Sequence, residues 1–356
     1  MQRRITVSLI AVFVTCLAAG VFSALSARGG AGAPDPLDHD LANAPVATRT
    51  LLSGPPAAVF DVPFEIGVLR IPSSGRIAAV VGKDDGRVAG DATRVFHIAD
   101  ARGTFARIEA TDLVLLDDAR ALTWTVRQGK AEIAEVDVRS GTSGWHVAVP
   151  GMRSGTLVHQ AGTNAWILSG RDTAGRPARA TGQIGLADVR MTAAPSPEGA
   201  AIDAWAAAGT AAVAVQNGSQ DARVWLSRGS QPPVPQALVN ATCGSDAASD
   251  RRLLCAIHDG RVERIFTLDL EGRAAGGLAV TDASFEMTDQ RAPGWLIGVS
   301  DGTPVALRLG SAELLQPASL DEEEAPSVLA VSGSTLATAA LTDLGTRIRV
   351  YRLNQF

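Results

Sequence analysis

The sequence predicts an all-β protein that repeats one β-hairpin along most of its length. Three observations support this prediction: strand-like runs of alternating apolar residues, tight turns marked by Asp-Gly or Asn-Gly, and glycines that close successive copies at a regular spacing. These glycines are separated by 38, 44, 44, 43 and 38 residues, and they are Gly103, Gly141, Gly185, Gly229, Gly272 and Gly310. A period of about 40 residues with strand content is typical of one four-stranded blade per copy, so we predict a β-propeller.

The N-terminus, residues 1–27, predicts a signal anchor that forms one transmembrane helix. Two arginines precede an uncharged run from Ile5 to Ala27, which is long enough to span a bilayer and longer than a usual secretory signal core. The basic end should stay in the cytoplasm, so the C-terminal domain would face outside the cytoplasmic membrane. The alternative is a signal peptide cleaved at Ala24-Leu25-Ser26, which would give a secreted or periplasmic protein.

Residues 28–45 predict a flexible tether. They are rich in Gly, Ala, Pro and Asp and show no hydrophobic periodicity, so they cannot bury enough surface to offset the entropy cost of ordering. The whole chain has a formal net charge of −5 and no basic stripe. Nucleic acid is therefore excluded as an expected partner, because a partner that binds phosphates needs clustered cations.

Seven copies of the hairpin lie within residues 46–356, the predicted propeller. They begin at Arg76, Leu122, Ala165, Ala211, Leu253, Trp295 and Leu336. Each copy is expected to be the central hairpin of a blade, flanked by an inner and an outer strand, which gives seven blades, with six or eight as the alternatives. A helix is an alternative only for residues 202–215, where the following Asn217-Gly218 turn favours strands.

The last copy predicts how the ring closes. The chain ends directly after the third strand of this copy, so blade 7 lacks an outer strand of its own. Residues 46–53, VATRTLLS, are expected to supply that strand, which would join the two ends of the propeller and protect an open sheet edge.

Two stretches share a strand, an aspartate, a glycine-containing turn and a second strand. They are IAEVDVRSGTSGWHVAVPG at 133–151 and IFTLDLEGRAAGGLAV at 265–280. Both resemble the repeats of bacterial β-propeller superfamilies, of the YVTN, quinoprotein and WD40-like types. The resemblance covers about residues 46–356, and it implies the fold without implying a specific function.

Cys243 and Cys255 predict a disulfide. They lie at equal distances from Ser249 within one hairpin, so they should face each other across two strands and pair in an oxidising compartment. Two buried free thiols are the alternative.

Four polar residues are candidates for chemistry at the central channel because they lie near the starts of inner strands or in the loops that lead into them: Asp112, His159, Asp203 and Glu286. Each of them is more often a polar group satisfied at a strand end than a catalytic group. No metal-ligand spacing or phosphate loop is found, so no catalytic set, metal site or cofactor is predicted. The six tryptophans are expected to pack between blades rather than to form a stacking platform.

A dense acidic run suggests a partner-binding face. Asp321, Glu322, Glu323 and Glu324 precede the last copy, and they should share a face with the Asp-Gly turns at Asp259 and Asp301. Clustered carboxylates would attract a basic partner, although a solvated loop is the alternative. The predicted function is therefore a membrane-anchored, extracytoplasmic scaffold that binds a protein or a small ligand. The alternatives are a hydrolase or lactonase with its site at the channel mouth, and a quinone-dependent dehydrogenase, which would demand a calcium site.

Overall fold

The computed structural model describes residues 44–356 apart from several short segments. The segments outside the description are 53, 84–92, 161, 195–200, 209, 220, 229–233, 247–248, 250, 260–261, 282–284, 290–293, 301–302, 310, 318–325 and 354–356. Within the described part, no helix is long and apolar enough to cross a membrane. The predicted anchor at 5–27 and all but the last two residues of the tether lie outside the described residues.

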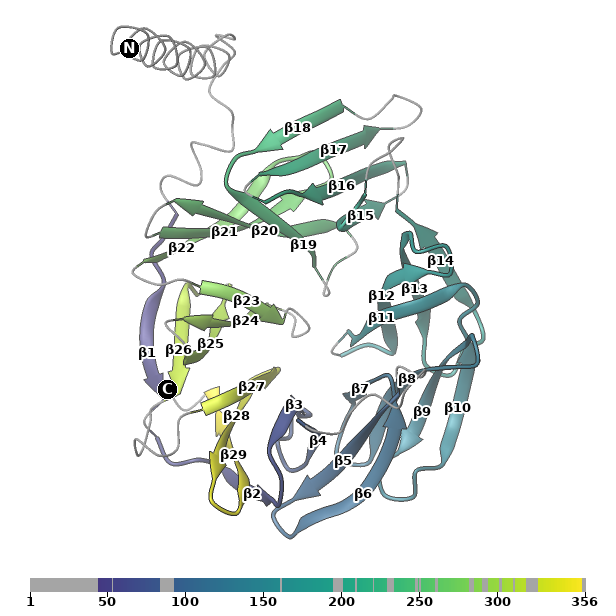
Figure 1. Ribbon diagram of the computed structural model, residues 1–356, viewed down its shortest axis with the longest axis vertical. Coiled ribbons are helices and arrows are strands. Elements are labelled where there is room, and N and C mark those ends of the chain that lie inside the picture. The colour runs from purple at the N-terminus through teal and green to yellow at the C-terminus, as the bar shows by residue number, and fades with distance from the viewer. Residues whose placement is uncertain are drawn as a thin grey trace, which may run out of the picture.

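Seven sheets are arranged in a ring (Figure 1), so the predicted all-β, seven-bladed propeller is confirmed. Blade 1 consists of β3 (Ile66–Arg70), β4 (Ala78–Gly82), β5 (Arg94–Asp100) and β6 (Gly103–Ala110). Blade 2 consists of β7 (Asp112–Leu115), β8 (Arg120–Arg127), β9 (Lys130–Asp137) and β10 (Ser143–Ala148). Blade 3 consists of β11 (Met152–His159), β12 (Ala165–Asp172), β13 (Pro177–Gln183) and β14 (Val189–Ala193).

The remaining blades follow the same antiparallel order. Blade 4 consists of β15 (Ala204–Ala208), β16 (Ala211–Asn217), β17 (Ala222–Arg228) and β18 (Val234–Leu238). Blade 5 consists of β19 (Ala241–Ser245), β20 (Arg252–Asp259), β21 (Val262–Asp269) and β22 (Ala274–Thr281). Blade 6 contains β23 (Phe285–Asp289), β24 (Trp295–Ser300), β25 (Thr303–Arg308) and β26 (Glu313–Pro317). Blade 7 contains β27 (Pro326–Ser332), β28 (Thr335–Thr342) and β29 (Gly345–Arg352).

The seven sequence copies are the second and third strands of the seven blades, as predicted. Turn chemistry explains this register at β8 and β9, where Arg127 pairs with Lys130 across a two-residue turn. Gln128 and Gly129 in that turn have φ values of 50° and 75°, the paired left-handed conformations that match the twist of a tight hairpin. Residues 202–215, the only stretch with a helical alternative, contain β15 and most of β16.

The closing strand differs from the prediction. Residues 46–53 do not complete blade 7, because β1 (Thr48–Leu52) pairs parallel with β26 and extends blade 6 to five strands. A later segment, β2 (Ala58–Val62), pairs antiparallel with β29 and supplies the outer strand of blade 7 (Figure 1). The physical reason is side-chain burial: Phe60 and Val62 of β2 are both buried in the core between blades 7 and 1, whereas β1 buries only Leu52.

The hydrophobic core is divided among the blade interfaces. One cluster joins blades 4 and 5, a second joins blades 7 and 1, and a third joins blades 1 and 2. Three tryptophans follow this pattern: Trp124 and Trp166 are buried between blades 2 and 3, and Trp295 is buried between blades 6 and 7. Each blade is therefore stabilised mainly by its neighbours, as in other repeat proteins.

The predicted disulfide between Cys243 and Cys255 is confirmed. The two residues face each other on β19 and β20, with their Cα atoms 4.1 Å apart. Both are buried in the core between blades 4 and 5.

Candidate functional site

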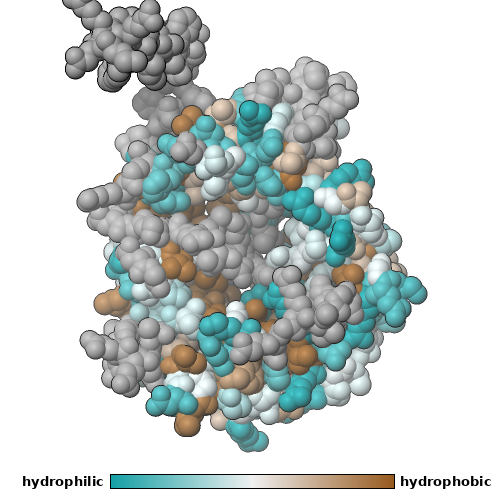
Figure 2. All heavy atoms as spheres, in the orientation of Figure 1, coloured by the Kyte–Doolittle hydropathy of each residue, from teal (hydrophilic) through white to brown (hydrophobic). Residues whose placement is uncertain are grey.

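The central channel holds a cavity of about 210 Å³ near the ends of several inner strands. Its wall is formed by β3, β7, β11 and β27 and the residues that follow them, together with Ile297 of β24, and most of the lining side chains are apolar. Polar side chains come from Arg70, Ser73, His159 and Ser332. We call this space the His159 cavity. Figure 2 shows the propeller in the same view as Figure 1, with hydrophobic residues beside the central hollow.

The apolar wall follows from the packing of the blades. Each blade is covered on both faces by its neighbours, so an inner strand tends to read as a continuous apolar run rather than as an alternating one. Strand β7 reads DLVL and the last four residues of β11 read TLVH. Where these strands pass the channel, some of their side chains, including Val114 and Leu157, line the cavity.

The predicted place of His159 near the start of an inner strand is wrong, because His159 is the last residue of β11. It is half-buried in the cavity wall. Its Nε2 lies 2.8 Å from the carbonyl oxygen of Thr163. Burial lowers the pKa of the imidazole, the hydrogen bond with Thr163 opposes this change, and the charge of Arg120 lowers the pKa further. The ring is therefore neutral near pH 7. Because a carbonyl oxygen only accepts, Nε2 carries the proton and Nδ1 is left as a hydrogen-bond acceptor.

Asp112 begins β7, as expected of a residue at the start of an inner strand, but its carboxylate has a structural role. One oxygen accepts from the backbone N–H of Leu113 and the other from that of Leu157 in blade 3, each at 3.0 Å. Arg70 of blade 1 places Nη2 3.9 Å from the same carboxylate. Asp112 is 5% exposed, so these contacts satisfy a buried charge and join three blades.

Asp203 lies directly before β15, and its side chain is exposed rather than buried in the channel. Its Oδ2 accepts a hydrogen bond of 2.8 Å from the backbone N–H of Asn217. The Asn217 side chain then exchanges two hydrogen bonds, of 2.8 and 2.9 Å, with the backbone of Cys243 in blade 5. The sequence identified Asn217 only as a turn residue, because no local pattern indicates that its amide joins two blades.

A second cavity, of about 330 Å³, lies near the starts of β3 and β27 and contains two arginines. Arg70 and Arg94 line it, together with Ser327 and apolar or glycine residues of blades 1, 6 and 7. Arg94 is the first residue of β5 and is partly buried. We call this space the Arg94 cavity. The sequence pattern indicates neither arginine, because their proximity arises only when the sheet of blade 1 places β3 and β5 on either side of β4.

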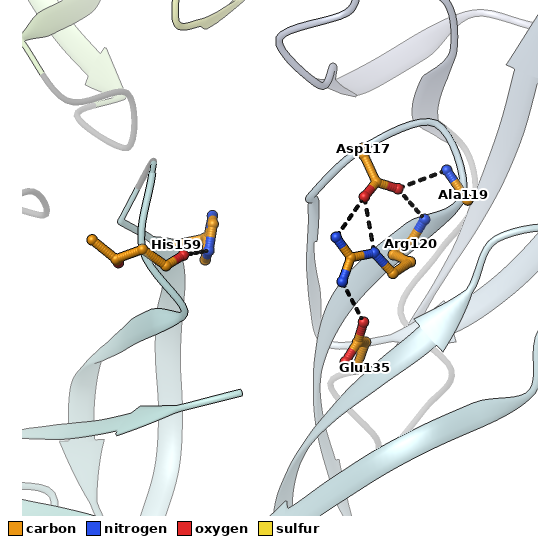
Figure 3. Close-up of polar contacts among 6 residues, drawn as sticks. Asp117, Ala119, Arg120, Glu135 and His159 are labelled. Carbon is orange, nitrogen blue, oxygen red and sulfur yellow. Dashed lines mark hydrogen bonds and ion pairs between the residues drawn. The ribbon is translucent and has the colours of Figure 1, made fainter. Parts of the chain in front are cut away.

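The turn between β7 and β8 holds a network of charged groups near His159 (Figure 3). Asp117 accepts hydrogen bonds from the backbone of Ala119 and from the backbone and guanidinium of Arg120. Burial raises the pKa of the Asp117 carboxyl, but these bonds and the charge of Arg120 outweigh it, so the pKa is lowered overall. Arg120 also binds Glu135 at 3.0 Å.

Similar turns explain the aspartates of the two stretches that resemble bacterial propeller repeats. Asp137 accepts from the backbone N–H groups of Arg139 and Ser140. Asp269 accepts from the backbone of Glu271 and from Arg273. These carboxylates therefore hold turns in place.

Among the described side chains, those of Asp112, His159 and Asp203 do not form one set, because they make separate contacts. The side chain of Glu286 lies outside the described part, as do the side chain of Asp259 and all of Asp301 and the acidic run 321–324. Among the described residues, no group of three or more His, Cys, Asp or Glu side chains could hold a metal ion. The described site thus consists of two cavities in the channel. His159 lines one of them, and Arg94 lines the other.

Comparison with known proteins gives distant likenesses. No family model matches the chain, and no curated protein matches it. The β-propeller domain of the Trilobed protease from Pyrococcus furiosus is 10% identical, with 81% of this chain and 95% of that chain covered and a TM-score of 0.47. The Cps50 (Swd1) β-propeller domain from Myceliophteria thermophila is 13% identical, with 82% and 97% covered and a TM-score of 0.45.

A third solved structure, the acylaminoacyl peptidase of Pyrococcus horikoshii, is 11% identical, with 80% of this chain and 52% of that chain covered and a TM-score of 0.47. Likenesses at this level carry no information about activity, substrate or partners. The propeller architecture rests on the strand order of the chain itself.

Proposed function

We propose that this protein binds a small, largely apolar molecule in the His159 cavity, as a propeller held outside the cytoplasmic membrane. The apolar wall of this cavity carries the proposal. Small-molecule sites are usually concave and mostly apolar, with a few polar groups that orient the ligand. Val114 and Leu157 supply apolar surface here, while Nδ1 of His159 supplies an acceptor. The volume of about 210 Å³ suits a small ligand or one part of a longer one.

A photoreactive probe tests this proposal. The full chain in lipid nanodiscs is irradiated with 1-octanol that carries a diazirine near the end of its chain, and the labelled peptides are mapped by mass spectrometry. Labelling is expected on β7, β11 and β27. The Val114→Phe substitution should fill the cavity and reduce this labelling by roughly tenfold, the equivalent of about 1.4 kcal/mol.

The matched control is Val59→Phe, because Val59 is exposed on β2 at the outer side of blade 7. It should leave the channel labelling unchanged. Labelling confined to the outer surface, or equal channel labelling in the wild type and Val114→Phe, would reject the cavity as the binding site.

Membrane attachment through residues 5–27 is part of the proposal, and the length of the uncharged run supports it. In a bacterial host, the full chain should stay in the membrane fraction after a carbonate wash. Protease added to spheroplasts should digest the propeller. A mature protein that begins after Ser26 would instead support the cleaved signal peptide.

A hydrolase with its site at the channel mouth is the second candidate, and the neutral His159 favours it. An imidazole with a free Nδ1 beside an apolar cavity can accept a proton from an attacking water molecule. The test is the hydrolysis of p-nitrophenyl butyrate by the full chain. If the protein is a hydrolase, His159→Gln should remove the activity without changing the melting temperature, and an equal rate in that variant would exclude His159 as the base.

A further inference from the structure

The two cavities are consecutive parts of one channel. The Arg94 cavity is lined by Gly67–Arg70 of β3 and by Ser327–Leu329 of β27, which include the early residues of these inner strands. The His159 cavity is lined by later residues of the same two segments, up to Ser73 and Gly333. Four residues line both spaces: Leu69, Arg70, Ile297 and Leu329. A ligand that extends along β3 and β27 would therefore pass from one cavity into the other.

The two cavities differ in charge. Arg70 and Arg94 line the Arg94 cavity, and no carboxylate is among the described residues of its wall. In the His159 cavity the imidazole is neutral at pH 7, and apolar side chains form most of the wall. One end of the channel thus favours an anion, while the other favours an apolar group.

Of the two arginines among the described wall residues, Arg94 is the one that can bind a ligand. Arg70 already donates to the carbonyl oxygen of Leu69 at 2.8 Å and faces the carboxylate of Asp112. Among the described residues, by contrast, no acidic side chain forms an ion pair with Arg94. A partly buried guanidinium beside apolar residues gains more from binding an anion than an exposed one does, because water screens the interaction less.

From this arrangement we infer that the channel binds a single-chain anionic amphiphile, such as a short fatty acid. Its carboxylate binds Arg94, and its chain runs past Leu69 and Leu329 into the His159 cavity. This inference rests on the proposed function, because it places the apolar part of the ligand in the same cavity. The inference adds an anionic head group to the ligand. It also assigns Arg94 as the residue that makes the channel prefer an anionic ligand to a neutral one.

The test compares three probes on the full chain in nanodiscs of zwitterionic lipid. Octanoate with a diazirine near the chain end carries both parts of the expected ligand. The matching 1-octanol probe carries the chain without the charge, and unlabelled acetate, used as a competitor, carries the charge without the chain. Octanoate should label β7, β11 and β27 at a lower half-saturating concentration than 1-octanol. Acetate should compete weakly with octanoate.

Arg94→Gln should raise the half-saturating concentration of the octanoate probe by about tenfold or more, the usual effect of losing a hydrogen bond to a charged group. It should leave 1-octanol labelling unchanged, and Arg94→Lys should restore much of the octanoate binding. The control is Arg107→Gln, since Arg107 is exposed on β6, the outer strand of the same blade. Comparison between variants in identical nanodiscs removes the contribution of probe dissolved in lipid.

The outcomes separate the two proposals. If 1-octanol labels the channel but octanoate binds no more tightly, and Arg94→Gln has no effect, the amphiphile is excluded while the apolar site stands. If neither probe labels the channel, both proposals fail. An equal loss of octanoate binding in Arg107→Gln would also overturn the role of Arg94, because general surface charge would then explain the effect.

Discussion

Strands β1 and β2 both come from the segment that precedes blade 1, yet they join the ring in different ways. β2 pairs antiparallel with β29 and completes a blade that otherwise has three strands. β1 pairs parallel with β26 and lies along the outside of a blade that already has four. Only five residues separate the end of β1 at Leu52 from the start of β2 at Ala58, so chain position alone does not decide which strand closes the ring.

The difference in side-chain burial shows what closure requires. Phe60 and Val62 are each 2% exposed, in a cluster that contains residues of blades 7 and 1. In β1, Leu52 is buried between blades 6 and 7, while its neighbour Leu51 is 59% exposed. A closing strand therefore has to supply core side chains to a blade interface, whereas an added edge strand mainly covers unpaired backbone groups.

The largest effect is expected from Phe60→Ala in β2. Removal of a buried phenylalanine ring from the interface that closes the propeller should lower the free energy of unfolding by about 3–5 kcal/mol. Urea unfolding followed by tryptophan fluorescence measures this change. Leu51→Ala in β1 is the matched control, and it should change the free energy by less than about 0.5 kcal/mol. Similar losses in both variants would mean that the two strands contribute alike.

The disulfide of blade 5 provides a second comparison, because it links two strands that are already paired within one blade. Replacement of Cys243 and Cys255 by alanine should lower the free energy of unfolding by up to about 3 kcal/mol, since the bond closes a short loop with a sequence separation of 12. The loss should be smaller than that of Phe60→Ala. Both cysteines are buried, so alkylation is done on the urea-unfolded, non-reduced protein. It should modify neither Cys243 nor Cys255, and modification of both would contradict the bond.

Leu52→Ala tests the single anchor of β1. The side chain is 1% exposed, in a cluster with Trp295 and Tyr351. The variant should lose about 2 kcal/mol, at the lower end of the range for a buried leucine, because an edge strand can move to fill part of the space. Urea unfolding gives the value. A loss as large as that of Phe60→Ala would show that β1 is as important for closure as β2.

The sequence predicts the repeat well because its signals are local. A tight turn such as Gln128-Gly129 fixes the register of the hairpin around it, and the same order of strand and turn recurs about every 40 residues. The prediction that residues 46–53 close blade 7 is wrong because TRTLL and AVFDV both read as short strands. What distinguishes β2 from β1 is the alternation of the apolar residues Phe60 and Val62. Their contribution to stability depends on contacts with blade 1, which the local sequence does not show.

The candidate site shows the same limit. The sequence pattern correctly predicts Asp112 at the start of an inner strand. It does not reveal that the second carboxylate oxygen accepts a hydrogen bond from the backbone of Leu157, 45 residues away in sequence. Arg94 has no local motif at all, and it becomes a candidate only when blades 1, 6 and 7 surround one cavity. Contacts between blades are therefore the part of this protein that the sequence pattern does not reveal.

The smallest effect is expected at the exposed ion pair that joins β2 to β29. Nε of Arg347 lies 2.9 Å from the Asp61 carboxylate, and the Asp61 side chain is 64% exposed. Asp61→Asn should therefore lower the free energy of unfolding by only about 0.2–1 kcal/mol, because water screens the pair. In about 1 M NaCl the change should vanish, since the Debye length falls to about 3 Å.

The control is the exposed ion pair of Arg127 and Glu109, which lie 2.8 Å apart and outside the closing strand. In urea unfolding, Glu109→Gln should lower the free energy of unfolding by the same small amount as Asp61→Asn. A markedly larger, salt-independent loss at Asp61 would show that closure depends on this ion pair and not mainly on the buried side chains of β2.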